Sequence, residues 1–387
     1  MDTIPVTVLG PSGSGKTLYL ASLFRRLAIQ RADTGFFVNV PGADKLRLNN
    51  IFREVTSGAP DEWPDPSMQA NTTEWTFTCS LRTEEGEVFS PFSLSYLDYS
   101  GAFMQIVDAW ESEAGQAVWD RVRASKFLLL LLDGEKVLRQ LDGEPGLTDE
   151  LIAIFNEIQQ SDAAVHVVVT KWDLLQAAGH TLRSVLDGLL EHPDFADFYL
   201  DRLNRKSVGT FRFIPVSALG QGYAVLDPAS RTMVKQVRPG TYPRPYNVEI
   251  PFMAVLVDLV RDELRASALR AESAGPVLEQ HRRRLERMEG WEGKLALLRG
   301  ALGARPARSP LLRLFQQDVL GAAEEYGRER IAERRQQVER EIAQVRGQML
   351  QARTEDEALT RMAEVFDAVL AEFEAVHPGS LVLKEAS

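Results

Sequence analysis

The chain's most telling segment reads Gly10-Pro11-Ser12-Gly13-Ser14-Gly15-Lys16-Thr17. A short apolar strand, residues 4–9, precedes it, and an amphipathic helix follows it. Glycines, lysine and threonine at this spacing, between a strand and a helix, are typical of a phosphate-binding P-loop. The glycines allow successive N–H groups to point at one anion, and the helix N-terminus adds partial positive charge. The segment therefore predicts a nucleoside triphosphate site, with Lys16 at the β- and γ-phosphates and Thr17 as a Mg²⁺ ligand.

Length and composition limit the classes of protein to consider. A chain of 387 residues predicts two domains. The formal net charge of -11 argues against nucleic acid as the main partner. The single cysteine, Cys79, excludes an internal disulfide and favours a reducing, cytoplasmic location. The longest apolar run, residues 127–132, is far too short to span a bilayer, and the N-terminus does not resemble a signal peptide.

Strand and helix signals alternate up to about residue 270, which predicts an α/β doubly wound, mostly parallel sheet with helices on both faces. We expect strands at 74–81 and 92–97, as an antiparallel pair, and at 126–132, 165–169 and 210–216. We expect helices at 46–55, 103–123, 149–159, 182–203 and 252–269. The predicted nucleotide-binding domain is thus residues 1–274, with an insertion at 31–72 and a long loop at 219–251.

Strand signals vanish after residue 274, so residues 275–387 are predicted to form a separate helical domain. Apolar residues recur there at the spacing of a short coiled coil or helical bundle, at Ile331, Val338, Ile342, Val345 and Met349. A break at residues 300–310 favours a helical hairpin. The apolar seam can be buried within the chain, or in an oligomer formed through these helices.

Two further motifs follow predicted strands at their carboxyl ends, where ligands bind in such sheets. The strand at 92–97 runs into Asp98-Tyr99-Ser100-Gly101, in which Asp98 can hold Mg²⁺ through water and the N–H of Gly101 can contact a γ-phosphate. The strand at 126–132 runs into Asp133-Gly134-Glu135, which could pass for the Walker B strand of an ATPase. However, the chain lacks the signature of a transporter ATPase, so we expect Asp133 to have no catalytic role.

The base is indicated by the next motif, Thr170-Lys171-Trp172-Asp173. A carboxylate at Asp173 can accept two hydrogen bonds from the edge of guanine, a pair of donors that adenine does not offer. The Lys171 stem can pack along the purine face. The strand at 210–216 ends in Ser217-Ala218-Leu219, where the N–H of Ala218 can meet the guanine carbonyl. The sequence therefore predicts a guanine site.

In their order and placement these motifs resemble a Ras-like GTPase domain of the TRAFAC class, over roughly residues 1–270. The resemblance implies binding of GTP and GDP with Mg²⁺, and Thr17, Asp98 and Thr73 (or Thr72) around the metal. The nucleotide contacts that it implies are Gly10, Ser12, Gly13, Ser14, Gly15, Lys16, Thr17, Gly101, Lys171, Asp173, Ser217 and Ala218. The insertion and the helical tail further resemble bacterial stand-alone GTPases that occur beside double-GTPase conflict and signalling systems.

Two departures from the Ras-like pattern concern the rate of hydrolysis. Ala102 stands where these proteins have a water-orienting Gln, and Gln105 lies about one helical turn further on. Ser12 replaces a P-loop glycine and crowds the γ-phosphate. We therefore expect a slow GTPase switch, with Lys16 and Gln105 as candidate catalytic residues and a protein effector or activating protein as partner. The alternatives are a non-hydrolysing GTP sensor or scaffold, and a dynamin-like mechanoenzyme.

Overall fold

The computed structural model describes most of the predicted nucleotide-binding domain and the end of the chain. The described residues are 3–30, 36–57, 63, 73–82, 86–98, 113–144, 147–205, 210–227, 233–236, 242–272 and 355–383. The chain divides into two units, one made of Met1–Leu256 with Ile342–Ser387 and the other of Val257–Glu341. The sheet and the candidate site belong to the first unit. Among the helices described, we find none with the length and apolar character that a membrane span requires.

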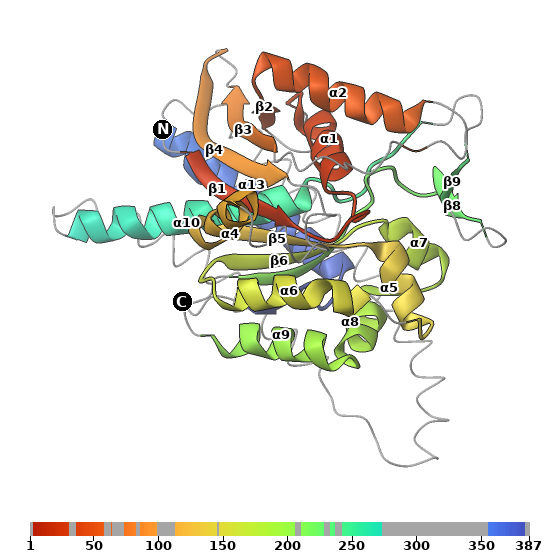
Figure 1. The fold of residues 1–387 in the computed structure, drawn as a ribbon. Helices are drawn as coiled ribbons and strands as arrows, with labels where there is room; N and C mark the ends of the chain where they lie inside the picture. Colours follow the sequence, from red (N-terminus) through yellow and green to blue (C-terminus); the bar gives the residue numbers. More distant parts are fainter. Residues whose placement is uncertain are drawn as a thin grey trace, which may run out of the picture. The chain divides into compact units, whose positions relative to one another are not determined.

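In the described residues an eight-stranded sheet has the order β10-β7-β6-β5-β1-β4-β3-β2 (Figure 1). The strands are β1 (Thr3–Leu9), β2 (Phe37–Asn39), β3 (Thr73–Arg82), β4 (Val88–Asp98), β5 (Phe127–Leu132), β6 (Ala164–Val169), β7 (Phe211–Pro215) and β10 (Leu381–Leu383). The five central strands, from β7 to β4, are parallel, whereas β3, β2 and β10 run antiparallel to their neighbours. The carboxyl ends of the parallel strands therefore meet at one edge of the sheet, and this edge carries all the predicted motifs.

Helices cover both faces of this sheet (Figure 1). The described helices are α1 (Lys16–Leu27), α2 (Gly42–Thr56), α4 (Glu113–Ala124), α5 (Gly134–Leu141), α6 (Leu147–Gln159), α7 (Trp172–Ala177), α8 (Leu182–Leu190), α9 (Pro193–Asn204), α10 (Ile250–Glu272) and α13 (Glu355–Val376). From Val257 on, α10 belongs to the second unit. Leu128, Leu130 and Leu132 of β5 pack in one core with helices α4 to α9, and the alternate residues of β5 are also fully buried. Burial on both faces explains why β5 is an uninterrupted apolar run. The chain has the predicted α/β P-loop fold.

Several predicted elements are confirmed, whereas the prediction of a long loop at 219–251 is partly wrong. Strands β3 and β4 form the expected antiparallel pair, and α2 is longer than the predicted helix at 46–55. Of the helix predicted at 103–123, α4 confirms the second half, while residues 99–112 lie outside the described residues. Within 219–251 the chain forms a hairpin of β8 (Ala224–Leu226) and β9 (Met233–Lys235). Strands of three residues have too little alternation to be recognised by pattern.

The end of the chain corrects the predicted division at residue 274. Strand β10 pairs antiparallel with β7, and the N–H of Phe213 donates to the Ser380 carbonyl at 2.7 Å. On α13, Phe366 is fully buried and meets Phe36 edge to face, with ring centroids 5.0 Å apart. Because the apolar face of α13 is buried within the sheet unit, residues 355–383 are part of that unit rather than of a separate helical domain. The predicted seam from Ile331 to Met349 lies outside the described residues.

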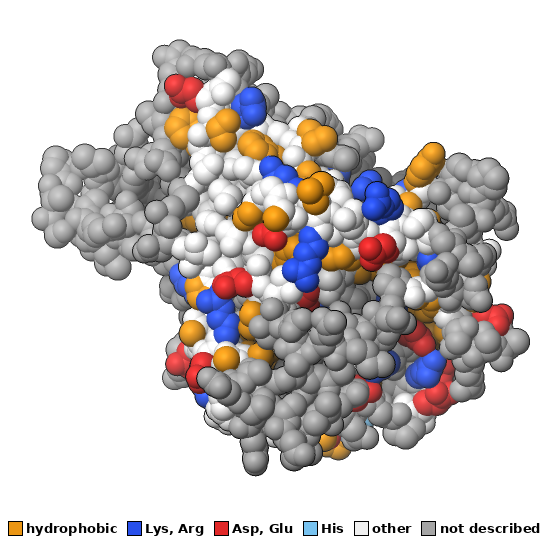
Figure 2. Space-filling view, turned by 45° about the horizontal axis from the view of Figure 1, so that its top comes forward, with side chains coloured by type: hydrophobic (Ala, Val, Ile, Leu, Met, Phe, Trp, Pro, Cys, Tyr) orange, Lys and Arg blue, Asp and Glu red, His pale blue; other side chains and the backbone are white. Residues whose placement is uncertain are grey.

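Figure 2 shows charged side chains of both signs on one face of the molecule. Among the residues described there, Lys and Arg are interspersed with Asp and Glu and with scattered apolar side chains. A duplex of nucleic acid is bound by a surface on which positive side chains gather along the phosphates. The described part of this face does not have that distribution.

Candidate functional site

The P-loop is a closed turn between β1 and α1. Gly10, Gly13 and Gly15 have φ of 155°, 80° and 77°, which side chains rarely adopt. A Cβ on Gly10 would lie 2.6 Å from the Leu131 carbonyl oxygen, so the loop also needs glycine there for close approach to β5. The Ser14 hydroxyl donates to the Pro11 carbonyl at 2.8 Å and closes the turn. The geometry is that of a phosphate cradle at the start of a helix.

Lys16 lies inside this loop. Its Nζ donates to the carbonyl oxygens of Gly10 at 2.8 Å and Pro11 at 3.1 Å, and the residue is 6% exposed. Burial lowers the pKa of Lys16 to about 8; the nearby Asp98 acts against this and Lys136 adds to it. An ammonium that burial disfavours is one that an approaching phosphate stabilises strongly.

Thr17 and Asp98 meet at the next point along the same edge. The Thr17 hydroxyl donates to Asp98 Oδ2 at 2.7 Å, because β1 and β4 are parallel neighbours that end side by side. Burial raises the pKa of Asp98, and the hydrogen bond from Thr17 and the charge of Lys16 oppose that rise. Thr73 stands opposite Asp98 in the β3–β4 pair, and its hydroxyl accepts from Arg47 Nη2 at 3.3 Å.

The hydroxyl of Thr17 and the carboxylate of Asp98 are oxygen groups of the kind that Mg²⁺ binds. In the described part of the chain there is no cluster of three or more His, Cys, Asp or Glu residues that could hold a metal ion by itself. Mg²⁺ needs fewer protein ligands when it is bound with a nucleotide, because it retains waters and takes phosphate oxygens. Thr17 and Asp98 would hold the ion directly and through water, respectively.

The Thr170–Asp173 motif is fastened to the P-loop. The Thr170 hydroxyl donates to the Ser14 carbonyl at 2.9 Å and to the Leu132 carbonyl at 3.1 Å. Lys171 has a left-handed backbone, and its Nζ lies 2.8 Å from Asp133 and 3.3 Å from Glu135. Burial lowers the pKa of Lys171, but the two carboxylates outweigh it and the net shift is upward.

Asp133, Gly134 and Glu135 thus have a role that the sequence analysis did not assign. The two carboxylates hold Lys171, and Asp133 also caps α5 by accepting from the Glu135 N–H at 3.0 Å. A Cβ on Gly134 would lie 2.1 Å from the Thr170 carbonyl oxygen, so these two strand ends are in direct contact. The sequence contained part of the signal for this contact, since both motifs directly follow buried apolar strands. The structure shows that these two strands, β5 and β6, are neighbours.

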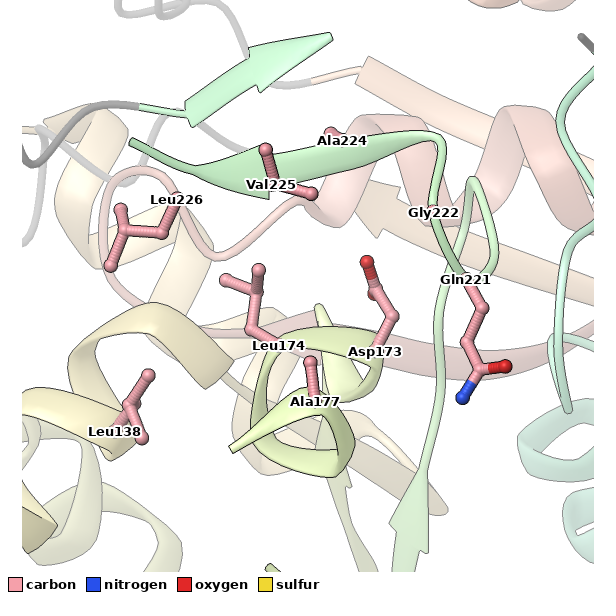
Figure 3. Close-up of a pocket in the computed structure, with 9 residues that line it drawn as sticks. All are labelled: Leu138, Asp173, Leu174, Ala177, Gln221, Gly222, Ala224, Val225 and Leu226. Atoms are coloured by element: carbon pink, nitrogen blue, oxygen red, sulfur yellow. The ribbon is translucent and has the colours of Figure 1, made fainter. Parts of the chain in front are cut away.

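Asp173 lies in the wall of a cavity of about 500 Å³ (Figure 3). The cavity is lined by Leu138, Asp173, Leu174, Ala177, Gln221, Gly222, Ala224, Val225 and Leu226. Asp173 is the one charged side chain of these nine, and it is 9% exposed. Burial raises its pKa, while a hydrogen bond from the Ser217 side chain opposes the rise. A carboxylate in such a wall suits a flat, neutral group that presents two N–H donors.

The Ser217–Leu219 loop is held against α1. The Ser217 hydroxyl accepts from the Gly220 N–H at 2.8 Å, and the Ser22 hydroxyl of α1 donates to the Ala218 carbonyl at 2.9 Å. The structure therefore brings the P-loop, Asp98, Lys171, Asp173, Ser217 and Ala218 to one edge of the sheet. Gly101, Gln105 and Thr72 lie outside the described residues.

Comparisons with known proteins give likenesses of fold. No protein-family model matches the chain, and no curated protein matches it. Among solved structures it is similar to the signal recognition particle receptor SRb-GTP/SRX complex from Chaetomium thermophilum, at 16% identity and a TM-score of 0.33, over 60% of this chain and 96% of that one. It is also similar to the S. cerevisiae Ski7 GTPase-like domain bound to GDP and inorganic phosphate, at 15% identity and a TM-score of 0.34, over 62% of this chain and 47% of that one. A third likeness is to Methanosarcina barkeri Roco2 RocCORdC bound to GDP, at 12% identity and a TM-score of 0.24, over 56% of this chain and 44% of that one. The chain thus spans less than half the length of the Ski7 and Roco2 chains.

Proposed function

We propose that this protein binds GTP and GDP with Mg²⁺ and hydrolyses GTP slowly, as a molecular switch. The observation that carries the proposal is the position of Asp173. It is the one charged residue among the nine described residues that line its cavity, and it lies at the same sheet edge as Lys16 and the Thr17–Asp98 pair. This placement supports the proposal, because groups suited to the phosphates and to the base of one nucleotide lie at the same sheet edge.

The phosphate half of the site rests on Lys16, Thr17 and Asp98. The Lys16 ammonium, now shared between two loop carbonyls, exchanges these for phosphate oxygens. Mg²⁺, when bound, neutralises charge on the β- and γ-phosphate oxygens. Thr17 and Asp98 are already within hydrogen-bonding distance, so little rearrangement is required before they serve as ligands.

The base half rests on Asp173 and Lys171. Asp173 accepts the two donors of the guanine edge, and Ser217 orients its carboxylate. The Lys171 ammonium is held by Asp133 and Glu135, which leaves its methylene stem to pack on the purine face. Ser217 and Ala218 close the site from β7.

The part of the proposal that concerns switching and turnover involves Thr73, Gly101 and Gln105. A γ-phosphate that draws in Thr73 and the Gly101 N–H orders two loops, and hydrolysis releases them. With Ala102 in the place of the water-orienting Gln, turnover is slow until a protein partner assists it. A role in bacterial signalling or defence is proposed only because the insertion and the helical tail resemble those of bacterial stand-alone GTPases.

The test compares nucleotide affinities and turnover. Affinity for GTP should exceed that for ATP and should fall when Mg²⁺ is removed. Steady-state phosphate release should occur on the order of 10⁻⁴ s⁻¹ without a partner. Equal affinity for ATP would refute the guanine assignment. Tight GTP binding with no turnover at all would favour the non-hydrolysing sensor, which Ser12 and Ala102 would then explain.

A further inference from the structure

The β8–β9 hairpin forms a wall of the Asp173 cavity. Ala224, Val225 and Leu226 of β8 line it, and β8 lies across the cavity from Leu174 and Asp173 of α7 (Figure 3). Val225 is 37% exposed, so part of its apolar side chain is accessible. The hairpin thus presents an apolar surface on the side of the cavity opposite to α7.

The same hairpin is attached to the end of α2 through Lys235 of β9 and through Tyr223, the residue before β8. Nζ of Lys235 donates to the Ser57 carbonyl at 3.0 Å, and the hydroxyl of Tyr223 donates to the Thr56 carbonyl at 3.1 Å. Both acceptors belong to the last turn and cap of α2, where carbonyls lack helical partners. A buried cation at a helix C-terminus is favourable for the helix dipole as well. Lys235 is 2% exposed, so its contact is well shielded from water.

Trp63 completes this attachment. Its Nε1 donates to the Met233 carbonyl of β9 at 2.7 Å, and the Lys235 ammonium lies 5.0 Å from the centre of its ring. Trp63 stands ten residues before Thr73, in the insertion that joins α2 to β3. The contacts therefore join Trp63 to both the backbone and a charged side chain of β9.

We propose that the β8–β9 hairpin is a base-retaining wall, with Val225 and Leu226 packing against the guanine held by Asp173 and with Lys235 and Trp63 keeping the hairpin closed. This proposal rests on the proposed function and names further residues for the same site. Val225 is a binding contact to the base, and Lys235 and Trp63 are positioning residues.

The contact is tested with Val225→Asp, which places a second carboxylate in the cavity wall. Two like charges across a cavity repel, and a charge displaces the apolar contact, so affinity for GDP should fall about tenfold or more. Val88→Asp is the matched control, since Val88 is 48% exposed on β4 and does not line the cavity. Inorganic tripolyphosphate, which has no base, serves as a second probe, and its affinity should stay unchanged in both variants.

The attachment is tested with Lys235→Met and Trp63→Phe, which remove the hydrogen-bond donors and keep most of the apolar volume. Each should accelerate dissociation of fluorescent GDP, by about tenfold for the charged donor and about threefold for the indole. Lys126→Met is the control, because Lys126 also lies over an aromatic ring, that of Phe127, but at the opposite end of β5 from the site. Preference for guanine over adenine should persist, since Asp173 is intact.

Four outcomes decide the matter. Selective loss of GDP affinity with unchanged tripolyphosphate affinity supports the wall. Equal weakening of both probes overturns it, because the hairpin would then act through general stability. Wild-type GDP affinity and dissociation in all three hairpin variants also overturn it, while wild-type protein that does not prefer guanine refutes the proposed function itself.

Discussion

Asp173→Asn is the perturbation that probes base recognition most directly. The carboxylate is 9% exposed, and Ser217 donates a hydrogen bond to it. The amide oxygen of Asn can still accept from Ser217, so the variant should keep the local structure. Toward guanine, however, the change removes the charge and replaces one acceptor by an N–H₂ donor, which then faces a donor of the base.

The expected loss follows from these two hydrogen bonds. A hydrogen bond to a charged group contributes roughly 1.5–3 kcal/mol, and leaving one donor unpaired adds a desolvation cost. GTP binding should weaken by about 3 kcal/mol, or roughly a hundredfold in Kd. Xanthosine triphosphate should bind more tightly to the variant than to the wild-type protein, because xanthine offers a carbonyl where guanine has its exocyclic amine.

The assay is competition of GTP, xanthosine triphosphate and ATP against a fluorescent nucleotide. Asp187→Asn is the control, since Asp187 is half exposed on α8 and pairs with Arg183 on the surface. A second readout is pH. Burial raises the pKa of Asp173 and guanine donors lower it again, so GTP affinity should be lost as pH falls through the raised pKa. If the variant keeps the wild-type preference for GTP over xanthosine triphosphate, the base assignment is wrong.

Two further outcomes concern the phosphate side of the site, and a third concerns the contact between Gly134 and Thr170. Lys16→Ala should remove most triphosphate affinity. In the wild-type protein the pKa of Lys16 is lowered from 10.5 to about 8, so triphosphate binding should take up a proton and should weaken as pH rises above about 8. Calorimetry in two buffers measures this proton uptake, and an absence of buffer dependence would contradict it. Thr17→Val should abolish the Mg²⁺ dependence of GTP affinity while Thr17→Ser retains it, and a Mg²⁺ response in the valine variant would count against Thr17 as a ligand. Gly134→Ala should lower the free energy of unfolding by about 3 kcal/mol, because its Cβ would lie 2.1 Å from the Thr170 carbonyl oxygen, whereas Gly42→Ala, with open space around it, should be neutral in the same denaturation experiment.

The sequence by itself determined the central sheet and the order of its motifs. Each motif is local: a buried apolar strand followed at once by polar residues at fixed spacing, as in residues 4–17 and 165–173. Parallel strands buried on both faces produce unmistakable apolar runs, and their carboxyl ends must share one edge. This is why the placement of Lys16, Asp98 and Asp173 at one edge could be expected before any coordinates.

Tertiary structure alone decided which distant segments complete that sheet and its site. Strand β10 and the hairpin strands β8 and β9 have three residues each, too few for a period to appear, and they exist because of partners far away in the chain. The burial of α13 beside Phe36 likewise depends on an aromatic contact between residues 330 positions apart. The contacts of Lys235 with Ser57 and Trp63 join the region 219–251 to the region around the end of α2, and nothing in the sequence pattern relates these two regions. The local sequence pattern determines whether a segment forms a strand or a helix. Which distant segments pair is determined by the burial and hydrogen bonding that they gain in the folded protein.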